Sequence, residues 1–448
     1  MTTIAALHSR FAQGDDSPVA LTERQIARVN DPAGEGARAF LQLDRAAVLR
    51  SADASCQRFA SGDIRPLEGV TLSIKDLYDV KGEVTGAGST VLRSRPAAIA
   101  DSPAVQRLRE AGAIIFGRNN MVEFAYSGIG INPHFGTPRN VWGRSGDGGG
   151  RVPGGSSSGG GVAVADGMAT AALGSDTGGS VRLPAALNGV CGFKPTAVRV
   201  PVVGAIPLSV THDSVGPIAN SVACCARIDA VLAGETYESK PLRSLKGVRL
   251  LKPNAVIWRE LDTEVETAIN LAVEKLRAAG AEIVETNVPA LDDLFSGSSV
   301  IAAEALDWHA ANINVNGKGY DPRVWLRMQA GSDVTRAQYS AAIAYRRFCV
   351  DRMNLALAGF DAVVSPTVAC IAPAIAPLVE SDELFFKTNA RILRNTAWVN
   401  FMDGCALTLP CHKKGDAPVG LQLTGSHGAD HVILALGLAC EAALAVAD

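Results

Sequence analysis

Ten glycines fall within the 19 residues from Gly143 to Gly161, and no other feature of the chain limits its folding as much. Glycine destabilises the interior of a helix or a strand, because it loses more backbone freedom on folding than any other residue. This segment should therefore form neither a stable helix nor a stable strand. The glycines bracket a triple serine, Ser156 to Ser158, and an Ala/Val-rich, helix-like stretch to Ala172 follows directly. A plain surface linker is therefore disfavoured.

A second glycine cluster follows in the run Leu173 to Pro184. Here Gly178 and Gly179 directly precede Ser180. Consecutive backbone N–H groups in such a turn can converge on one point and bind an anion. The phosphate-binding pattern GxxxxGK is missing, and so is a GxGxxG between a strand and a helix. The cluster therefore favours stabilisation of an oxyanion over binding of a nucleotide.

Helix and strand patterns alternate along the rest of the chain. The run Val70 to Lys75 alternates strictly between apolar and polar residues, which predicts a half-buried strand with Lys75 on its polar face. Leu108–Phe116 and Leu276–Val284 repeat one helix-to-strand pattern. Helices that alternate with strands predict an α/β sheet. Further features are a helix start at Ser102 and Pro103, strands over Gly247–Lys252 and Phe360–Val364, and a polar linker candidate over Gly234–Ser244.

Composition excludes several classes of protein. The chain is 47% apolar and 19% charged, as in ordinary globular proteins, and 42 basic against 45 acidic residues leave a net charge of −3. Nucleic acid is therefore not an expected partner. The longest apolar stretch, Val432 to Ala447, contains Glu441 and is too short to span a bilayer, so we expect a buried helix and no membrane contact.

The nine cysteines are an odd number without a CxxC pair, which indicates reduced thiols and a cytoplasmic location. Cys405, Cys411 and His412 come nearest to a metal cluster, but a fourth ligand is missing. No metal site is therefore expected.

The sequence also permits other functions. Gly155-x-Ser157-x-Gly159 matches the nucleophile elbow of α/β-hydrolases, but no apolar strand precedes it and no HGGG-type loop is present. A cysteine nucleophile at Cys191 near Lys194 stays open, as does a binding protein without catalysis. The histidines that could complete an α/β-hydrolase triad are His412, His427 and His431.

Taken together, the two glycine clusters resemble the amidase signature of the Ser-Ser-Lys amidohydrolases. In weaker form the resemblance covers most of the chain, through residues 73–76, 189–196, 365–367 and 418–422. It implies an α/β fold in one large domain, residues 1–448, whose central mixed, mostly parallel twisted sheet is covered by helices on both faces. Within this domain, residues 1–65 or so would be a helical segment and about 66–220 the catalytic core. The remainder would complete the sheet and cover the site.

The resemblance also implies the catalytic residues. Ser180 matches the family's nucleophile, Ser156 its bridging serine and Lys75 its lysine, and the peptide bond between Gly155 and Ser156 would be cis. Ser157, Asp176 and Arg182 match positions that hold the loops and the serines in place. The oxyanion hole would consist of the backbone N–H groups of Thr177, Gly178, Gly179 and Ser180, whose glycines would leave room for the substrate. The segment 121–128 resembles the acyl-side wall of the pocket, which makes candidate substrate contacts of Phe124, Tyr126, Ser127 and Gly128.

The chemistry of such a site follows from the residues themselves. A serine hydroxyl is a weak nucleophile, and a lysine can act as its base only when burial lowers the lysine pKa. Lys75 would take a proton from Ser156, Ser156 would take one from Ser180, and Ser180 would attack the amide carbonyl.

The resemblance therefore implies an amidase without a cofactor, whose partner is a small-molecule carboxamide, or an aryl or urea-type amide. The products would be a carboxylate and ammonia or an amine. The alternative is the glutaminase A subunit of a tRNA-dependent amidotransferase. A homodimer is the default assembly. Trp308, His309 and 324–328 are candidates to cover the mouth of the pocket, and 143–151 bears on its shape.

Overall fold

The centre of the molecule is one large mixed sheet. The computed structural model describes residues 3–145, 149–238, 244–294, 299–313 and 316–445. The strands are β1 (Phe40–Gln42), β2 (Thr71–Lys75), β3 (Ile114–Asn119), β4 (Ala171–Asp176), β5 (Cys191–Lys194), β6 (Ser214–Ala219), β7 (Arg249–Pro253), β8 (Glu282–Thr286), β9 (Ala362–Pro366), β10 (Cys405–Pro410) and β11 (Gly420–Gly425). They form an 11-stranded sheet in the order β1-β3-β2-β4-β6-β5-β10-β11-β9-β7-β8. The predicted single α/β domain is confirmed.

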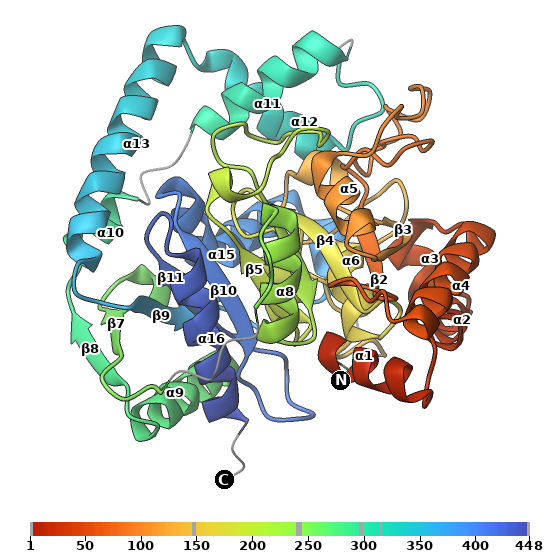
Figure 1. Ribbon diagram of the computed structural model, residues 1–448. Coiled ribbons are helices and arrows are strands. Elements are labelled where there is room, and N and C mark those ends of the chain that lie inside the picture. The colour runs from red at the N-terminus through yellow and green to blue at the C-terminus, as the bar shows by residue number, and fades with distance from the viewer. Residues whose placement is uncertain (1–2, 146–148, 239–243, 295–298, 314–315, 446–448) are drawn as a thin grey trace.

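Helices cover both faces of this sheet (Figure 1). Helices α8 and α16 pack together on one face over β5, β6 and β10, and α6 and α7 pack on the other face over β4 and β5. The helices are α1 (Ile4–Gln13), α2 (Pro18–Val29), α3 (Gly36–Ala39), α4 (Arg45–Ser61), α5 (Pro103–Glu110), α6 (Ser158–Ala165), α7 (Arg182–Leu187), α8 (Val222–Ala233), α9 (Thr263–Ala278), α10 (Pro289–Asp293), α11 (Ser299–Asn312), α12 (Pro322–Gln329), α13 (Arg336–Leu357), α14 (Ile375–Glu380), α15 (Asp382–Phe401) and α16 (Asp430–Leu444).

The prediction of a mostly parallel sheet is wrong. Four neighbouring pairs, β2 with β3, β2 with β4, β7 with β8 and β7 with β9, run parallel. The other six described pairs are antiparallel. Antiparallel neighbours need no crossover helix, and β10 is joined to β11 by a short loop. The helix-to-strand pattern of the sequence marks only the outer parts of the sheet.

Most of the local predictions are confirmed. Helix α5 begins at Pro103 with Ser102 as its N-cap, and both repeated units are a helix followed by a strand, α5 with β3 and α9 with β8. The two further strand candidates correspond to β7 and β9, and the C-terminal helix is α16. Residues 239–243 of the linker candidate and 446–447 of the predicted C-terminal helix lie outside the described residues.

Strand β2 is buried on both faces, contrary to the prediction of a half-buried strand. Its polar face is covered by protein: the Thr71 hydroxyl lies 2.9 Å from that of Thr170, and the Ser73 hydroxyl donates to the Ala171 carbonyl oxygen at 3.3 Å. Lys75 ends this same face and is therefore enclosed by protein instead of water.

The glycine-rich segment also differs from its prediction, because α6 begins inside it, at Ser158. Its glycines allow unusually close packing. A Cβ atom at Gly159 would lie 2.3 Å from the Ala39 carbonyl oxygen, and one at Gly161 would lie 2.8 Å from Pro184 Cβ. Contacts with neighbouring elements thus outweigh the low helix propensity of glycine. The stretch expected to stay helical to Ala172 instead enters β4 at Ala171.

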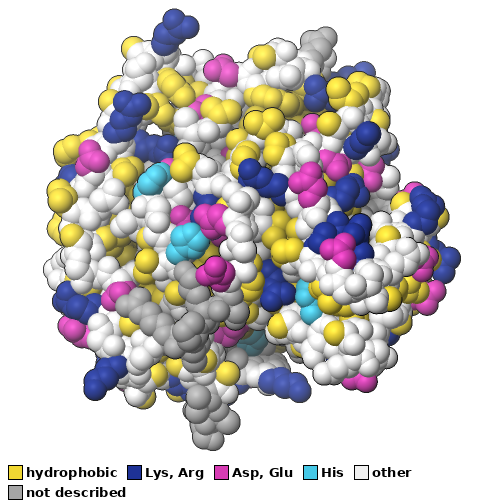
Figure 2. All heavy atoms as spheres, viewed as in Figure 1, with side chains coloured by type: hydrophobic (Ala, Val, Ile, Leu, Met, Phe, Trp, Pro, Cys, Tyr) yellow, Lys and Arg dark blue, Asp and Glu magenta, His cyan; other side chains and the backbone are white. Residues whose placement is uncertain are grey.

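The surface carries charges of both signs, with no large field of one sign on the face shown in Figure 2. Within the described residues, no helix is long and apolar enough to cross a membrane. The mixture of charges agrees with the net charge of −3.

Candidate active site

Lys75, Ser156 and Ser180 meet at the end of β2 and β4, on three separate segments. Lys75 ends β2, Ser156 lies in the loop before α6, and Ser180 lies in the turn between β4 and α7. All three are buried, with 1%, 0% and 4% of their surface exposed. Lys75 Nζ lies 2.7 Å from Ser156 Oγ and 2.8 Å from Ser175 Oγ. The structure thus brings together the lysine and the serine that the resemblance pairs.

The loops that carry the two serines are tied through their backbones. The Ser157 N–H donates to the Ser180 carbonyl oxygen at 3.2 Å. The peptide bond between Gly155 and Ser156 is cis, as the resemblance implies. No hydrogen bond joins the Ser156 and Ser180 hydroxyls in the described part of the chain. The loops of Ser156 and Ser180 are therefore held next to each other through their backbones.

Burial gives Lys75 an unusual acidity. It lowers the pKa of Lys75 from 10.5 to about 7, while the charges of Asp176 and Asp213 act in the opposite direction. A lysine amine in an enclosed site loses the water that would stabilise its charged form. A substantial share of Lys75 is therefore neutral near pH 7 and able to accept a proton.

Asp176 and Arg182 form a buried ion pair that holds the turn around Ser180. The Asp176 carboxylate accepts from Arg182 Nη2 at 2.9 Å and Nε at 3.0 Å, and from the Gly179 and Val181 N–H groups at 2.8 and 3.1 Å. Burial by itself would raise the pKa of Asp176, but the Arg182 guanidinium holds this pKa well below its usual range. Arg182 also donates to the Gln422 and Asn400 side chains, so β11 and α15 are joined to the same turn.

One of the four N–H groups predicted to form the oxyanion hole already has a hydrogen-bond acceptor within the protein. The Gly179 N–H donates to Asp176, so it is not available to a substrate, and this part of the prediction is wrong. In the described part of the chain, the N–H groups of Thr177, Gly178 and Ser180 have no hydrogen-bond partner. Glycine is required at position 179 because a Cβ atom there would lie 2.2 Å from Thr396 Oγ1, not because it would crowd the substrate.

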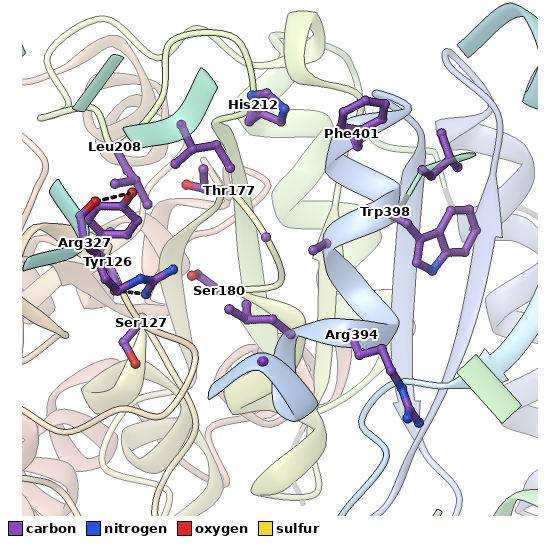
Figure 3. Close-up of a pocket in the computed structure, with 17 residues that line it drawn as sticks. Tyr126, Ser127, Thr177, Ser180, Leu208, His212, Arg327, Arg394, Trp398 and Phe401 are labelled. Carbon is purple, nitrogen blue, oxygen red and sulfur yellow. Dashed lines mark hydrogen bonds between the residues drawn. The ribbon is translucent and has the colours of Figure 1, made fainter. Parts of the chain in front are cut away.

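A cavity of about 310 Å³ opens beside Ser180 (Figure 3). Tyr126 and Ser127 line it, as the sequence predicts, but Phe124 and Gly128 are not among its lining residues. Phe124 packs edge-on against the His309 ring at 4.3 Å, and the Gly128 N–H donates to Asn389. The remaining lining residues are Ala125, Thr177, Gly178, Ser180, Leu208, His212, Leu294, Ile301, Arg327, Ala390, Leu393, Arg394, Ala397, Trp398 and Phe401.

Arg327 is the pocket residue whose role the sequence does not reveal, although the expected cover over 324–328 includes it. It lies on α12, donates from Nη1 to the Tyr126 carbonyl oxygen, and stacks on the Tyr126 ring at 4.3 Å. In Figure 3 its guanidinium group points toward Ser180. Among the described residues, no carboxylate pairs with it. Its positive charge is therefore available to a ligand in the pocket.

His212 supplies a neutral ring to the same pocket. Burial lowers its pKa to about 3. Nδ1 lies 2.8 Å from Thr211 Oγ1 and 3.1 Å from Ser209 Oγ, and both hydroxyls donate to Glu304. Because those hydroxyl protons are used on Glu304, Nδ1 carries the hydrogen, and Nε2 is an acceptor with no hydrogen-bond partner among the described residues. The ring therefore contributes shape to the pocket and no charge.

The structure disfavours the competing mechanisms that use Ser157 or Cys191 as the nucleophile. The Ser157 hydroxyl donates to the Ser175 carbonyl oxygen, and the histidines of the elbow hypothesis do not line the pocket beside Ser180. Burial raises the pKa of Cys191 well above its usual value, so its thiol is a poor nucleophile. The described part of the chain contains no metal-ligand cluster. The described residues of the loop 143–151 likewise do not line this pocket.

The first prediction concerns the buried ion pair. Replacing Arg182 with Met should lower the free energy of unfolding by about 3 to 5 kcal/mol, because Asp176 is left charged and unpaired in the interior. Arg277, which pairs with Glu274 on the surface of α9, is the control: Arg277→Ala should cost less than about 1 kcal/mol. Urea denaturation followed by circular dichroism measures both. Equal stability of the two variants would contradict this account.

Comparisons with known proteins show the family of the chain. Residues 20–434 match the model of the family described as Amidase. The chain is 35% identical to a 2-amino-5-chloromuconic acid deaminase of Comamonas testosteroni, over 85% of this chain and 82% of that protein. It is 30% identical to the A subunit of the glutamyl-tRNA(Gln) amidotransferase of Roseiflexus castenholzii, over 97% and 94%. A solved amidase structure superposes with a TM-score of 0.87 at 33% identity, over 98% and 99% of the two chains. The protein therefore belongs to the amidase family and is a hydrolase of amide C–N bonds.

Proposed function

We propose that the protein is a stand-alone amidase that cleaves a small-molecule carboxamide, or an aryl or urea-type amide, through an acyl-enzyme on Ser180. The products are a carboxylate and ammonia or an amine. The observation that carries the proposal is the 2.7 Å contact between the buried Lys75 amine and the Ser156 hydroxyl, next to a pocket that Ser180 lines.

The proposed reaction begins with Lys75 in its neutral form. Lys75 accepts the Ser156 proton, Ser156 accepts the Ser180 proton, and Ser180 Oγ forms a bond to the amide carbon. The tetrahedral intermediate collapses when the relay, running in reverse, delivers a proton to the leaving nitrogen and the C–N bond breaks. Water then attacks the acyl-enzyme by the same relay and releases the carboxylate.

The oxyanion of each tetrahedral intermediate would be held by the free N–H groups of Thr177, Gly178 and Ser180. Donors that are fixed before the reaction stabilise the developing charge without reorganisation, and the loss of one such donor costs about 3 to 4 kcal/mol. Ser157, Asp176 and Arg182 act indirectly, because their hydrogen bonds fix the two loops that carry the serines.

The pocket also suggests the class of substrate. Its volume of about 310 Å³ suits a small molecule, and Trp398, Phe401 and Leu393 give it an apolar wall. Arg327 adds a guanidinium group without a carboxylate partner in the described residues, at the side of the pocket formed by Tyr126 and Ser127 (Figure 3). A guanidinium favours a carboxylate or another group rich in oxygen atoms. We therefore propose that the preferred amides carry a negative charge.

The second candidate function is the glutaminase A subunit of a tRNA-dependent amidotransferase. It is favoured by the 30% identity to such a protein over 97% of this chain. The two candidates differ in an assay of the purified protein. A stand-alone amidase hydrolyses simple amides by itself, whereas the glutaminase of an amidotransferase releases ammonia from glutamine only when its partner subunits have been added. The homodimer and the cytoplasmic location stay predictions from the sequence.

Substitution of the relay residues tests the proposal. Ser180→Ala should lower turnover at least about 10⁴-fold, because it removes the hydroxyl that attacks the amide carbon. Lys75→Ala should come close to that loss, while the control Ser157→Ala keeps measurable activity. Ammonia release from a panel of primary amides measures all three. Substantial activity in Ser180→Ala would remove Ser180 from the mechanism.

The acidity of Lys75 predicts the pH dependence. Its pKa is lowered to about 7, so the active neutral form is lost as the pH falls through 7. Below that point kcat/KM should decrease about tenfold for each pH unit, because one proton blocks the base. Initial rates between pH 5 and pH 9 measure this limb. A value of kcat/KM that is constant from pH 8 down to pH 5 would contradict the role of Lys75.

Arg327 predicts a preference between matched substrates. Glutaramic acid carries a carboxylate that butyramide lacks, so the wild type should favour glutaramic acid. In Arg327→Met, kcat/KM for glutaramic acid should fall about 10- to 100-fold, the range for a hydrogen bond to a charged group. The value for butyramide should change little. An unchanged ratio of the two substrates would show that Arg327 does not select for charge.

A further inference from the structure

Asp213 lies directly before β6, and both oxygens of its carboxylate accept hydrogen bonds. Oδ1 accepts from the Thr177 hydroxyl at 2.5 Å. Oδ2 accepts from the Leu208 N–H at 2.9 Å and from the Ser209 N–H at 3.2 Å. Thr177 belongs to the turn that carries Ser180, and Leu208 lines the pocket. This one side chain therefore joins the turn that carries Ser180 to the loop of Leu208 and Ser209.

The consequence for Thr177 follows from its position. Its hydroxyl is fixed on Asp213 while its backbone N–H has no hydrogen-bond partner among the described residues. The direction of a backbone N–H depends on the conformation of its residue, and oxyanion donors act only when they are aimed before the reaction. A carboxylate that anchors the Thr177 side chain therefore restricts the direction of its N–H.

Asp213 also differs from Asp176 in the way that its charge is balanced. Both carboxylates act on Lys75 through their charge. The charge of Asp176 is neutralised by Arg182, with the two groups 2.9 Å apart. Asp213 has no arginine, lysine or histidine within salt-bridge distance in the described part of the chain. Its charge is therefore available to Lys75 when the lysine takes up the proton of the relay.

We propose that Asp213 is a positioning residue of this site, which fixes Thr177 in the oxyanion turn and supplies the negative charge that stabilises Lys75 in its protonated form. The proposal rests on the proposed function, because both roles refer to the serine relay.

Two other titratable groups near this carboxylate, Tyr78 and His212, are neutral, so neither competes with Lys75 for its charge. Tyr78 donates to the Gly174 carbonyl oxygen, and burial raises its pKa well above 10, so it stays neutral. His212 stays neutral because burial lowers its pKa to about 3. Burial raises the pKa of Asp213 to about 6, against the effect of its hydrogen bonds. Above pH 7, Asp213 is therefore charged while Lys75 is mostly neutral, the arrangement that the relay needs.

The test is the pH profile of Asp213→Asn, which keeps the shape of the side chain and removes its charge. The fall of kcat/KM at low pH, its acid limb, should move to lower pH by about one unit. Removal of a negative charge near Lys75 lowers the lysine pKa, so the neutral amine persists to lower pH. The value of kcat at pH 8 should fall about 10- to 100-fold, with a smaller change in KM. Asp229→Asn is the matched control. Asp229 is also a buried carboxylate, but it pairs with Arg199 away from this pocket. The acid limb of kcat/KM in Asp229→Asn should therefore not move. An unmoved acid limb in Asp213→Asn would overturn the role of its charge.

A second variant tests the link to Thr177. Thr177→Val removes the hydroxyl and keeps the backbone, so kcat should fall while the acid limb moves much less than in Asp213→Asn. A double variant of Thr177→Val with Asp213→Ala, which removes the accepting oxygen, should be little worse than Asp213→Ala alone, since both changes break one contact. Losses of activity that multiply would show independent roles and overturn the link. If Asp213→Asn does not fold, thermal unfolding will reveal it, and the loss of kcat in Thr177→Val still decides whether this contact serves the reaction.

Failure of this inference and failure of the proposed function have different signatures. Activity that survives in Ser180→Ala contradicts the serine relay as a whole. An inactive Ser180→Ala together with an unmoved acid limb in Asp213→Asn leaves the relay in place and contradicts only the role of Asp213.

Discussion

The site depends on one physical constraint, which is the enclosure of the Lys75 amine by protein. Water would keep this amine charged and unable to accept a proton. Burial lowers its pKa to about 7 and places it 2.7 Å from Ser156 Oγ. The enclosure requires strand β2 to be covered on both faces, including its polar face. The position of the strand in the sheet and the acidity of its last residue are therefore two results of the same packing.

The glycines allow the remaining loops to reach this amine. Close approach of α6 to neighbouring backbone brings the loop of Ser156 toward β2. Because Gly179 has no side chain, Thr396 can pack directly against the turn of Ser180. The ion pair of Asp176 and Arg182 then holds the turn of Ser180 against α15 and β11. Such a pair contributes little net stability, but it is costly to break on one side. It is therefore suited to fixing one conformation of the turn.

The sequence predicts the parts of this site that depend on local pattern. The alternation before Lys75, the glycine clusters around both serines and the helix-to-strand repeats are all visible without coordinates. The antiparallel centre of the sheet is not, because strand direction depends on connections that periodicity does not describe. The bond from the Gly179 N–H to Asp176, the packing of Phe124 on His309 and the position of Arg327 all depend on contacts between distant segments. A single sequence does not show which of these side chains face the pocket.

The central claim is that Ser180 is the nucleophile and that Lys75 activates it. Treatment with a fluorophosphonate, followed by intact mass and peptide mapping, tests both parts at once, since the reagent labels activated serines. The account predicts one adduct, on Ser180, and strongly reduced labelling in Lys75→Ala. An adduct on Ser157, or equal labelling of Ser180 with and without Lys75, would contradict it.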